Sequence, residues 1–449
     1  MRTSISIRWM VRYGVPRGIL AVQARRGQPL ARFLLGRASG DEMYRLVEQI
    51  RQRGRLVRRP LLWVSVDHEI CRMVLRDDRF GVTNPVNIPL PQPFPALMKR
   101  TDPGLPNPVE PPTMLMVDPP DHTRYRRLVA QSFTPRAIGG LSARVAEITT
   151  ELLDGLACNP QPDLLGDFAA ELPVAVITEL LGLPTDARPR VRKWGYSLAP
   201  LLDLGISWKT YRHAIENLRE VDRYVAQQVE RLRNGDPGDN PFSRLAVSRD
   251  LTHREFAANA ALLVGAGFET TVNLIGNGIV RLLEHPQQLA QLRDNPALWP
   301  AAIEEILRFD SPLQMVVRTA GCDIEIAGER IGAGEMVALL LGGANRDPRV
   351  FSDPGRFDIT RPNARDHLAF GSGIHGCLGA ALARIEGTIA LRALFERFPD
   401  LSLSEQPKPL ELVTLHGFKQ LPAQLRGKPA GEAQPVSQSH NPYRRPAPR

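Results

Sequence analysis

The feature that most constrains this 449-residue chain is a glycine-rich loop with one cysteine near its end. The segment Phe-Gly-Ser-Gly-Ile-His-Gly-Cys-Leu-Gly runs from Phe370 to Gly379, and Ala-Ala-Leu-Ala-Arg follows it as the predicted start of a helix. Gly371, Gly373 and Gly376 allow positive φ and close backbone approach. At a helix N-terminus, the macrodipole and unpaired N–H groups lower a thiol pKa and donate hydrogen bonds to sulfur. The pattern therefore favours a thiolate that binds a metal.

Other interpretations of Cys377 were weighed against metal binding. An isolated cysteine in a soluble protein is ordinarily a buried structural residue. A zinc site would need three or four clustered ligands, but Cys71, Cys158 and Cys322 are scattered along the chain. A cysteine nucleophile would need a base, and His375 precedes the cysteine by two residues in a tight loop, where it points elsewhere. What remains is a cysteinate on haem iron.

The motif Phe-Gly-x-Gly-x-His-x-Cys-x-Gly resembles the haem-binding loop of the cytochrome P450 family, and every fixed position is filled here. The resemblance implies haem b (iron protoporphyrin IX) with Cys377 as its proximal ligand. It also implies a mainly α fold with a smaller β region, in which the haem is buried between a long central helix, about 252–284, and the cysteine-loop helix. The other cofactor-binding positions that it implies in the loop are Phe370, Gly371, His375 and Gly379.

A long run with helical periodicity, 252–284, contains Gly-Ala-Gly at 265–267. Each glycine lowers the stability of a helix by about 1 kcal/mol relative to alanine. Two glycines inside one helix therefore indicate a structural or functional role. The bare surface suits a flat macrocycle, and a packing groove for another helix is the alternative. Thr270, one turn beyond Ala266, can bond back to that carbonyl and locally open the helix. By the resemblance, Ala266 and Gly267 contact the haem.

An acid and an alcohol, Glu269 and Thr270, stand side by side in this helix. They are the parts that a proton relay needs, because cleavage of an O–O bond requires protons. They match the acid–alcohol pair of the family residue by residue, which makes them the predicted catalytic residues.

Glu305 and Arg308 are spaced to lie on one helix face, where they can form an ion pair. Such pairs are common on surfaces. Their place between the central helix and the cysteine loop makes them a match for the structural Glu-x-x-Arg of the family. Arg356, in a segment that resembles the family's Pro-x-Arg-Phe, is the expected third member, and Arg361 is the alternative. We assign this network to maintenance of the fold.

A proline-stopped turn and a basic helix start occupy 118–127. By the resemblance, His122, Arg126, Arg318 and His375 hold the two haem propionates. Arginine suits this role because its planar fork engages a carboxylate bidentately. The alternative for arginines at 124, 126 and 127 is a solvated helix face, and we expect Arg127 to be a surface charge.

Prolines cluster in Pro85–Pro112, which cannot form a continuous helix or central strand. This long loop resembles the lid of the family's substrate pocket, with Tyr196–Trp208 as the opposite wall. The pocket-lining residues are mostly apolar, which favours a hydrophobic substrate. By resemblance alone, they are Val264, Ala266, Leu313, Gln314, Met315, Val316 and Phe418.

The family pattern extends from about residue 41 to 425. It predicts a basic N-terminal arm at 1–40, one cytochrome P450 domain at 41–425 and a disordered basic tail at 426–449. Amphipathic helices are predicted at 141–155 and 212–233, and strands near 61–66 and within 316–341.

The net charge of +9 belongs to the two ends of the chain, because residues 1–37 hold eight arginines and no acid, and the tail is also basic. No nucleic-acid partner is therefore expected. Contact of the arm with an anionic membrane stays open as an alternative. The apolar runs of the arm are too short for a signal peptide or a membrane span, and the scattered cysteines favour the cytoplasm.

The resemblance implies a monooxygenase that inserts one atom of O2 into an apolar small molecule, by hydroxylation or epoxidation, and reduces the other atom to water. No four-cysteine cluster or added domain follows Cys377. Electrons are therefore expected from a separate acidic ferredoxin with an NAD(P)H-dependent ferredoxin reductase, docking near basic residues on the cysteine-loop side. A peroxygenase or rearrangement catalyst is one alternative, which the Glu269-Thr270 pair disfavours. A haem-binding ligand carrier or sensor, which needs no relay, is the other.

Overall fold

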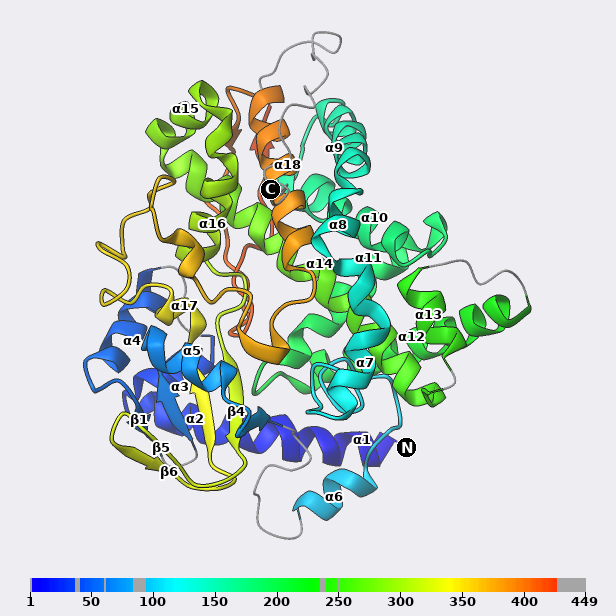
Figure 1. The fold of residues 1–449 in the computed structure, drawn as a ribbon, viewed down its shortest axis with the longest axis vertical. Helices are drawn as coiled ribbons and strands as arrows, with labels where there is room; N and C mark the ends of the chain where they lie inside the picture. Colours follow the sequence, from blue (N-terminus) through cyan, green and yellow to red (C-terminus); the bar gives the residue numbers. More distant parts are fainter. Residues whose placement is uncertain are drawn as a thin grey trace, which may run out of the picture.

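The predicted central helix is present as α14 (His253–Glu284) in the computed structural model, which describes residues 2–36, 41–59, 62–83, 94–234, 240–248 and 250–425. Thr252 begins it with a capping box: its hydroxyl accepts from the Glu255 N–H, and the Glu255 carboxylate accepts from the Thr252 N–H. Apolar residues occur all round this helix, so it is buried on most sides and runs through the middle of the molecule (Figure 1).

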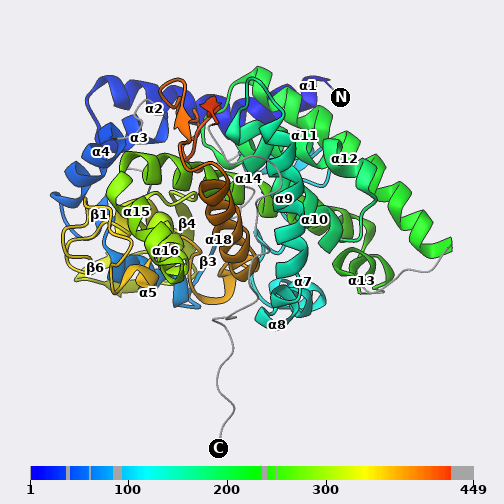
Figure 2. The same cartoon turned by 90° about the horizontal axis from the view of Figure 1, so that it is seen from above.

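Helices make up most of the described chain and surround α14 (Figures 1 and 2). The helices predicted at 141–155 and 212–233 are confirmed as α9 and α12. The α-helices and π-helices before α14 are α1 (Arg2–Trp9), η1 (Met10–Gly14), α2 (Val15–Arg25), α3 (Pro29–Leu34), α4 (Asp41–Arg51), α5 (His68–Arg76), α6 (Phe94–Arg100), α7 (Asp121–Ala130), α8 (Pro135–Gly139), α9 (Ser142–Ala157), η3 (Leu164–Ala169), α10 (Glu171–Leu180), α11 (Arg188–Leu198), α12 (Trp208–Asn234) and α13 (Pro241–Val247). Those after it are α15 (Pro286–Asp294), α16 (Trp299–Phe309), α17 (Leu341–Ala344) and α18 (Ala380–Arg397). Short 3-10 turns are η2 (Gln131–Phe133), η4 (Thr185–Ala187), η5 (Ala199–Leu202), η6 (Pro296–Leu298), η7 (Ala364–Asp366) and η8 (Gly373–His375).

The helix that follows the cysteine loop, α18, packs directly against α14. Gly278 of α14 makes this close approach feasible, because a Cβ there would come within 2.5 Å of the Leu391 side chain on α18. The shared core continues through α9, α10, α11 and α16. The two helices expected to enclose the cofactor are thus held in one apolar core.

Within the described ranges, α14 is the one helix that is long and apolar enough to cross a membrane by length and composition. However, 78% of its most apolar window is buried inside the fold. Its hydropathy is that of a core helix.

The strand regions predicted near 61–66 and within 316–341 join in one five-stranded sheet. Its order is β1 (Val57–Arg58), β2 (Trp63–Ser65), β7 (Met336–Leu339), β4 (Val316–Ala320) and β3 (Phe80–Val82). Strands β2 and β7 are parallel, and the other neighbours are antiparallel. Two further antiparallel pairs are the hairpin of β5 (Ile324–Ile326) with β6 (Glu329–Ile331), and β8 (Ser402–Leu403) with β9 (Ala423–Gln424), which a long connection joins. The mainly α fold with a smaller β region is confirmed.

The N-terminal arm is helical and packs on the body through α1, η1, α2 and α3. Ile5 and Tyr13 belong to the main core, whereas Leu30 and Phe33 join a second apolar cluster beside the sheet. The tail at 426–449 and residues 84–93 of the proline-rich segment lie outside the described residues, and so does Arg37 at the end of the arm.

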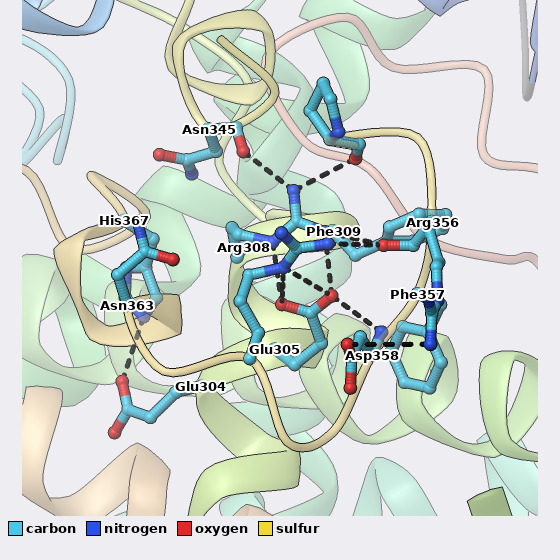
Figure 3. A network of polar contacts seen from close by, with 12 residues as sticks. Glu304, Glu305, Arg308, Phe309, Asn345, Arg356, Phe357, Asp358, Asn363 and His367 are labelled. Carbon is cyan, nitrogen blue, oxygen red and sulfur yellow. Dashed lines mark hydrogen bonds and ion pairs between the residues drawn. The ribbon is translucent and has the colours of Figure 1, made fainter. Parts of the chain in front are cut away.

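A buried ion-pair network fixes the segment that leads to the cysteine loop (Figure 3). Glu305 and Arg308 are both fully buried on α16 and form two hydrogen bonds of 2.7 Å. Arg308 also donates to the carbonyl oxygens of Asn345, at 3.0 Å, and of Arg356, at 3.2 Å (Figure 3). The Glu305 carboxylate accepts from the Asp358 N–H at 2.9 Å. The predicted pair is therefore a buried anchor for backbone 345–358.

The expectation that Arg356 completes this network is wrong, and the alternative, Arg361, takes the place. The Arg356 side chain is 66% exposed, and only its carbonyl oxygen joins the network. Arg361 is buried, its Nε lies 3.2 Å from Glu305 Oε2, and it donates to the carbonyl oxygens of Ser352 and Asp353. The cause is the turn between the two arginines, which directs the second one inward.

We expect Arg361→Ala to lower the free energy of unfolding by about 3 kcal/mol, because it leaves buried charge at Glu305 and orphans several carbonyl oxygens. Urea unfolding followed by tryptophan fluorescence measures this loss. Arg356→Ala is the matched control and should stay within about 0.5 kcal/mol of the wild type. A larger loss for Arg356→Ala than for Arg361→Ala would contradict the assignment.

Candidate active site around the cysteine loop

The cysteine loop has the local geometry that its glycines predicted, with one exception. Gly371 and Gly373 have φ of 68° and 72°, and a Cβ at Gly373 would clash with the Leu75 carbonyl oxygen. Gly376 has φ of −53°, so its expected positive φ is not used. The Cys377 N–H donates to the Phe370 carbonyl oxygen at 2.9 Å, which closes the loop.

The Cys377 thiol lies just before α18, as predicted, because Gly379 is the N-cap and the helix begins at Ala380. Burial raises the pKa of this thiol, while the Gly379 N–H and the guanidinium groups of Arg126 and Arg384 act in the opposite direction. Cys377 is nevertheless an exposed residue, and the nearby positive groups favour the thiolate form of its side chain.

Four cationic or imidazole side chains come from three elements to the region beside this loop. His122 and Arg126 lie on α7, Arg318 lies on β4, and His375 lies in η8. The ring centroids of His122 and His375 are 4.2 Å apart, and Arg126 donates to the Gly376 carbonyl oxygen at 2.8 Å. Asp118 connects the set, because its carboxylate interacts with both His375 and Arg318 and its own pKa is lowered. The predicted cluster is therefore brought together.

The polar atoms of this cluster fit a group with two carboxylates. His122 is 3% exposed, and both of its ring nitrogens are buried without a hydrogen-bond partner among the described residues. Burial also lowers its pKa to about 4, so it is held as a neutral imidazole. The Arg318 guanidinium donates to the Val317 carbonyl oxygen, and burial lowers its pKa. Buried donors with few protein partners suit a bound anion, and the haem propionates are such anions.

The bare patch expected on α14 is present, but its two glycines differ. A Cβ at Gly265 would meet nothing within 4 Å, and Ala266 is exposed on a helix that is otherwise buried. A Cβ at Gly267 would lie 3.3 Å from the Ile177 side chain on α10. The open surface is thus at Gly265 and Ala266, whereas Gly267 serves the helix packing that was the alternative interpretation.

Thr270 donates to the Ala266 carbonyl oxygen at 3.0 Å, as predicted. Residues 253–284 are nevertheless α-helical without interruption, so the expected local opening of the helix is not seen. A threonine hydroxyl can bond to the carbonyl four residues earlier while the helix hydrogen bonds persist.

Glu269 is 5% exposed, and burial raises its pKa to about 7. Its Oε2 atom is buried without a hydrogen-bond partner among the described residues. Within the part of the chain that the structure describes, no cation compensates for the burial of this carboxylate, so it is neutral and ionised in similar amounts near neutral pH. This is the protonation behaviour that a proton-transfer group requires.

Comparisons with known proteins decide the family. The cytochrome P450 family model matches residues 196–426. "Putative cytochrome P450 140" of Mycobacterium tuberculosis (strain ATCC 25618 / H37Rv) is 44% identical over 427 residues, covering 93% of this chain and 97% of its own. The chain belongs to the cytochrome P450 family.

Two further similarities add detail to this P450. The 6-deoxyerythronolide B hydroxylase of Saccharopolyspora erythraea is 41% identical, covering 69% of this chain and 77% of its own. The crystal structure of P450BioI in complex with hexadec-9Z-enoic acid ligated acyl carrier protein is 34% identical with a TM-score of 0.77, covering 85% of this chain and 98% of that one. The protein is therefore a haem-binding monooxygenase with the P450 fold, in a family whose haem is bound through a cysteine thiolate.

Sequence reasoning missed a buried acid on α18 that contacts α14 in this P450. Glu386 on α18 is 1% exposed, burial raises its pKa to about 8, and a hydrogen bond from Thr271 partly offsets that increase. Thr271 directly follows Thr270 on α14. The signal in the sequence is an acid at the buried face of α18, between Leu382 and Ala390, where an apolar residue is expected.

Sequence reasoning also missed the contacts that hold the cysteine loop from α16. Glu304 accepts hydrogen bonds from Arg384, at 2.7 Å, and lies 3.1 Å from His367 Nε2 (Figure 3). The Arg384 guanidinium in turn lies 4.6 Å from the ring centroid of Phe370. Phe370 is thus placed by a cation that Glu304 orients. The adjacent acids at 304 and 305 were the available signal, since two carboxylates on a mostly apolar helix need partners.

The residues predicted to line the substrate pocket fall into two groups. Gln314 and Met315 are corrections. Gln314 is 1% exposed, donates to the Ser311 carbonyl oxygen and packs on Gly342, while Met315 is buried in the apolar cluster beside the sheet. Both side chains are therefore used inside the fold. The others keep their positions as candidates: Val264, Ala266, Leu313, Val316 and Phe418.

We expect the stability of Glu269→Gln relative to the wild type to increase with pH. The folded-state pKa lies above the ordinary 4.5, so the wild type loses stability as pH rises from about 4.5 to about 7 and the buried carboxyl ionises. Glutamine cannot ionise. The variant should therefore match the wild type near pH 5 and exceed it by about 3 kcal/mol at pH 8.

Urea midpoints of the haem-loaded protein at several pH values measure this difference. Glu284→Gln, at the exposed end of the same helix, is the control and should leave the pH profile unchanged. A constant difference between Glu269→Gln and the wild type over this range would contradict a raised pKa.

Proposed function

We propose that this P450 uses Cys377 as the thiolate ligand of its haem, Glu269 and Thr270 as its proton relay, and a separate ferredoxin as its electron source, to oxygenate an apolar small molecule. The observation that carries the proposal is the packing of the two helices beside which these residues lie. Cys377 lies just before α18, α18 packs against α14, and α14 carries the open patch at Gly265 and Ala266 with Thr270 bonded to it.

The overall reaction balances as RH + O2 + 2 e⁻ + 2 H⁺ → ROH + H2O. When bound, the haem iron supplies the activation of dioxygen, and the thiolate of Cys377 donates electron density to the iron. His122, Arg126, Arg318 and His375 would hold the propionates. The protein's own task is then to bind the cofactor and deliver two protons while keeping bulk water away.

Proton delivery is proposed to pass through two neighbouring side chains of α14. The Thr270 hydroxyl is anchored on the Ala266 carbonyl oxygen, which fixes its oxygen atom beside the open patch. Glu269 has a pKa of about 7, so it both gives up and regains a proton near neutral pH. Glu269 would therefore supply the proton, and Thr270 would hold the acceptor site at a fixed position.

An apolar substrate is supported by the candidate lining and by one neighbour. Val264, Leu313, Val316 and Phe418 are apolar side chains, and no charged residue is among the candidates. P450BioI, which shares the fold, was crystallised with a hexadec-9Z-enoic acid chain on its acyl carrier protein. We accordingly propose hydrophobic substrates for this protein.

One set of variants tests both assignments. The carbon monoxide difference spectrum of the reduced wild type and of Thr270→Ala should show the red-shifted Soret band of a thiolate ligand, and Cys377→Ser should lose it. With a substrate identified by spin-state shift, Thr270→Ala should consume NAD(P)H but release mostly hydrogen peroxide, because protons no longer reach the O–O bond in time.

Thr270→Ser, which keeps the hydroxyl, should restore coupled product formation. Unchanged coupling of NAD(P)H consumption to product formation in Thr270→Ala would contradict the role of this residue. If no product forms in the wild type or in any variant, the carrier or sensor alternative is favoured. A red-shifted band that persists in Cys377→Ser would contradict the ligand assignment.

Electron delivery is proposed to occur on the face around the cysteine loop. Five exposed arginines surround it, and within the described residues none of their side chains forms an ion pair. Two exposed apolar side chains, Met73 and Ile374, lie among them. A cavity of about 250 Å³ between α8, α16, η7 and α18 opens on the same side. A basic rim with a small apolar centre suits an acidic ferredoxin in the cytoplasm. The arginines are Arg72, Arg76, Arg127, Arg136 and Arg365.

We expect Arg72→Glu/Arg76→Glu to raise the KM for an acidic ferredoxin about tenfold, equivalent to about 1.4 kcal/mol, with a smaller difference at high salt. Steady-state reduction kinetics measure this effect, and reduction by dithionite should stay unchanged. Arg25→Glu is the control, because Figure 2 shows α2 on the opposite side of the molecule from α5, α7 and α8. If Arg25→Glu raised the KM for ferredoxin as much as Arg72→Glu/Arg76→Glu does, this docking face would be contradicted.

A further inference from the structure

The N-terminal arm makes polar contacts with two loop segments that lie far apart in the sequence. One segment is 98–110, which begins in the last turn of α6, and the other is 201–208, which runs from the end of η5 to the start of α12. In Figure 1 the α1 helix runs beside α6, and in Figure 2 it lies near α11 and α12. The contacts to each segment come from different faces of the same arm.

The contacts with the first segment centre on the buried Glu110. Arg8 is 1% exposed, and it donates at 2.6 Å to Glu110 Oε2 and at 2.6 Å to the Met98 carbonyl oxygen. Arg12 pairs with the other Glu110 oxygen and donates to the Val109 carbonyl oxygen at 3.3 Å. Glu110 itself is 5% exposed. Two arginines of the arm thus share one buried carboxylate, and removing one partner of such a group leaves buried charge unpaired.

The contacts with the second segment reach backbone carbonyl oxygens. Trp9 Nε1 donates to Ile206 at 3.0 Å, and Arg17 donates to Gly205 at 2.7 Å. The Tyr13 hydroxyl donates to Leu201 at 3.4 Å. Because these contacts involve the backbone of 201–206, the position of this segment depends on the arm.

Both segments adjoin residues that contact α14, at Asn259 before its open patch and at Phe268 after it. The chain that follows the first segment is tied to Asn259, whose Oδ1 accepts from the Met114 N–H at 2.8 Å and whose Nδ2 donates to the Pro112 carbonyl oxygen at 3.2 Å. The second follows α11, where Gly195 lies so close to Phe268 that a Cβ would clash, and the Tyr196 and Phe268 rings are 5.1 Å apart. The residues adjoining both segments thus contact α14 close in sequence to Gly265 and Ala266.

We propose that the arm joins the two segments and limits the size of molecule that reaches the α14 patch, with Arg8, Arg12 and Glu110 as the positioning residues. This inference rests on the proposed function, because it takes the patch as the site of oxygenation. Access for a bulky molecule requires the segments to separate. Separation must break either the shared ion pair at Glu110 or the contacts of Trp9, Tyr13 and Arg17.

The test compares ligands of two sizes on haem-loaded variants. Glu110→Gln removes the charge that the two arginines share while keeping the side-chain volume. Stopped-flow absorbance should show association of a bulky azole, clotrimazole, about tenfold faster than in the wild type, which corresponds to about 1.4 kcal/mol in the equilibrium between joined and separated segments. Association of imidazole, which is small, should be unchanged.

Two further variants keep the test independent of folding defects. Arg17→Met loosens the other segment and should also accelerate clotrimazole binding selectively. Glu42→Gln disrupts the exposed Arg32–Glu42 pair at the end of the arm and should change neither rate. An equal acceleration of both azoles, or any acceleration in Glu42→Gln, would overturn the proposal.

Hydrogen exchange separates this inference from the proposed function, since it needs no catalysis. In Glu110→Gln, amide exchange in 98–110 and in 201–208 should rise together, while exchange in α18 stays as in the wild type. A rise confined to 98–110 would overturn the joining role. Absence of the thiolate band in the wild type would instead refute the proposed function and leave the exchange result valid.

Discussion

The fully buried pairing of Glu305 with Arg308 is the interaction on which the rest of the site depends. A buried charge is stable only when its partner and its hydrogen bonds are complete, so the pair imposes its geometry on the chain around it. Arg308 donates hydrogen bonds to the backbone carbonyl oxygens of Asn345 and Arg356. Glu305 pairs with Arg361 and accepts a hydrogen bond from the Asp358 N–H. The neighbouring Glu304 orients Arg384 and His367. One helix, α16, therefore fixes both the segment that enters the cysteine loop and the helix that leaves it.

The opposite side of the site depends on apolar packing. Helix α14 is held by α10, α11, α16 and α18 in a single core, and Gly265 and Ala266 form an open stretch in the buried middle of the helix. Two carboxylic acids, Glu269 and Glu386, are buried in this region with no cation against them among the described residues. Burial without a partner costs stability, and it also gives pKa values near neutrality. The cost is acceptable for a site that must exchange protons, whereas the ion pairs under the cysteine loop keep their charges fixed.

Much of the site could be predicted because its residues belong to short local patterns. The glycine loop before α18, and Thr270 one turn beyond Ala266, have geometries that follow from spacing alone. Arg361 could not be separated from Arg356, because the choice depends on how the chain turns over α16. The predictions for Met315 and Gln314 were wrong for a similar reason. Tertiary packing decides whether a residue just before β4 faces a pocket or the apolar cluster beside the sheet. The buried role of Glu386 needed the phase of α18 relative to α14.

The N-terminal arm shows why a charge count alone is a weak guide to partners. Its eight arginines and lack of acids suggested an unpaired basic segment, with an anionic membrane as one alternative. In the folded chain, Arg8 and Arg12 share the single carboxylate of Glu110, about a hundred residues away, and Arg32 pairs with Glu42. Arg17 binds a backbone carbonyl oxygen. Four of the seven arginines of the described arm, Arg8, Arg12, Arg17 and Arg32, therefore make polar contacts within the chain. Arg25 and Arg26 are exposed, as are the apolar side chains of Ile19 and Val22 on α2. The charge of the arm is thus divided between contacts within the fold and an exposed surface.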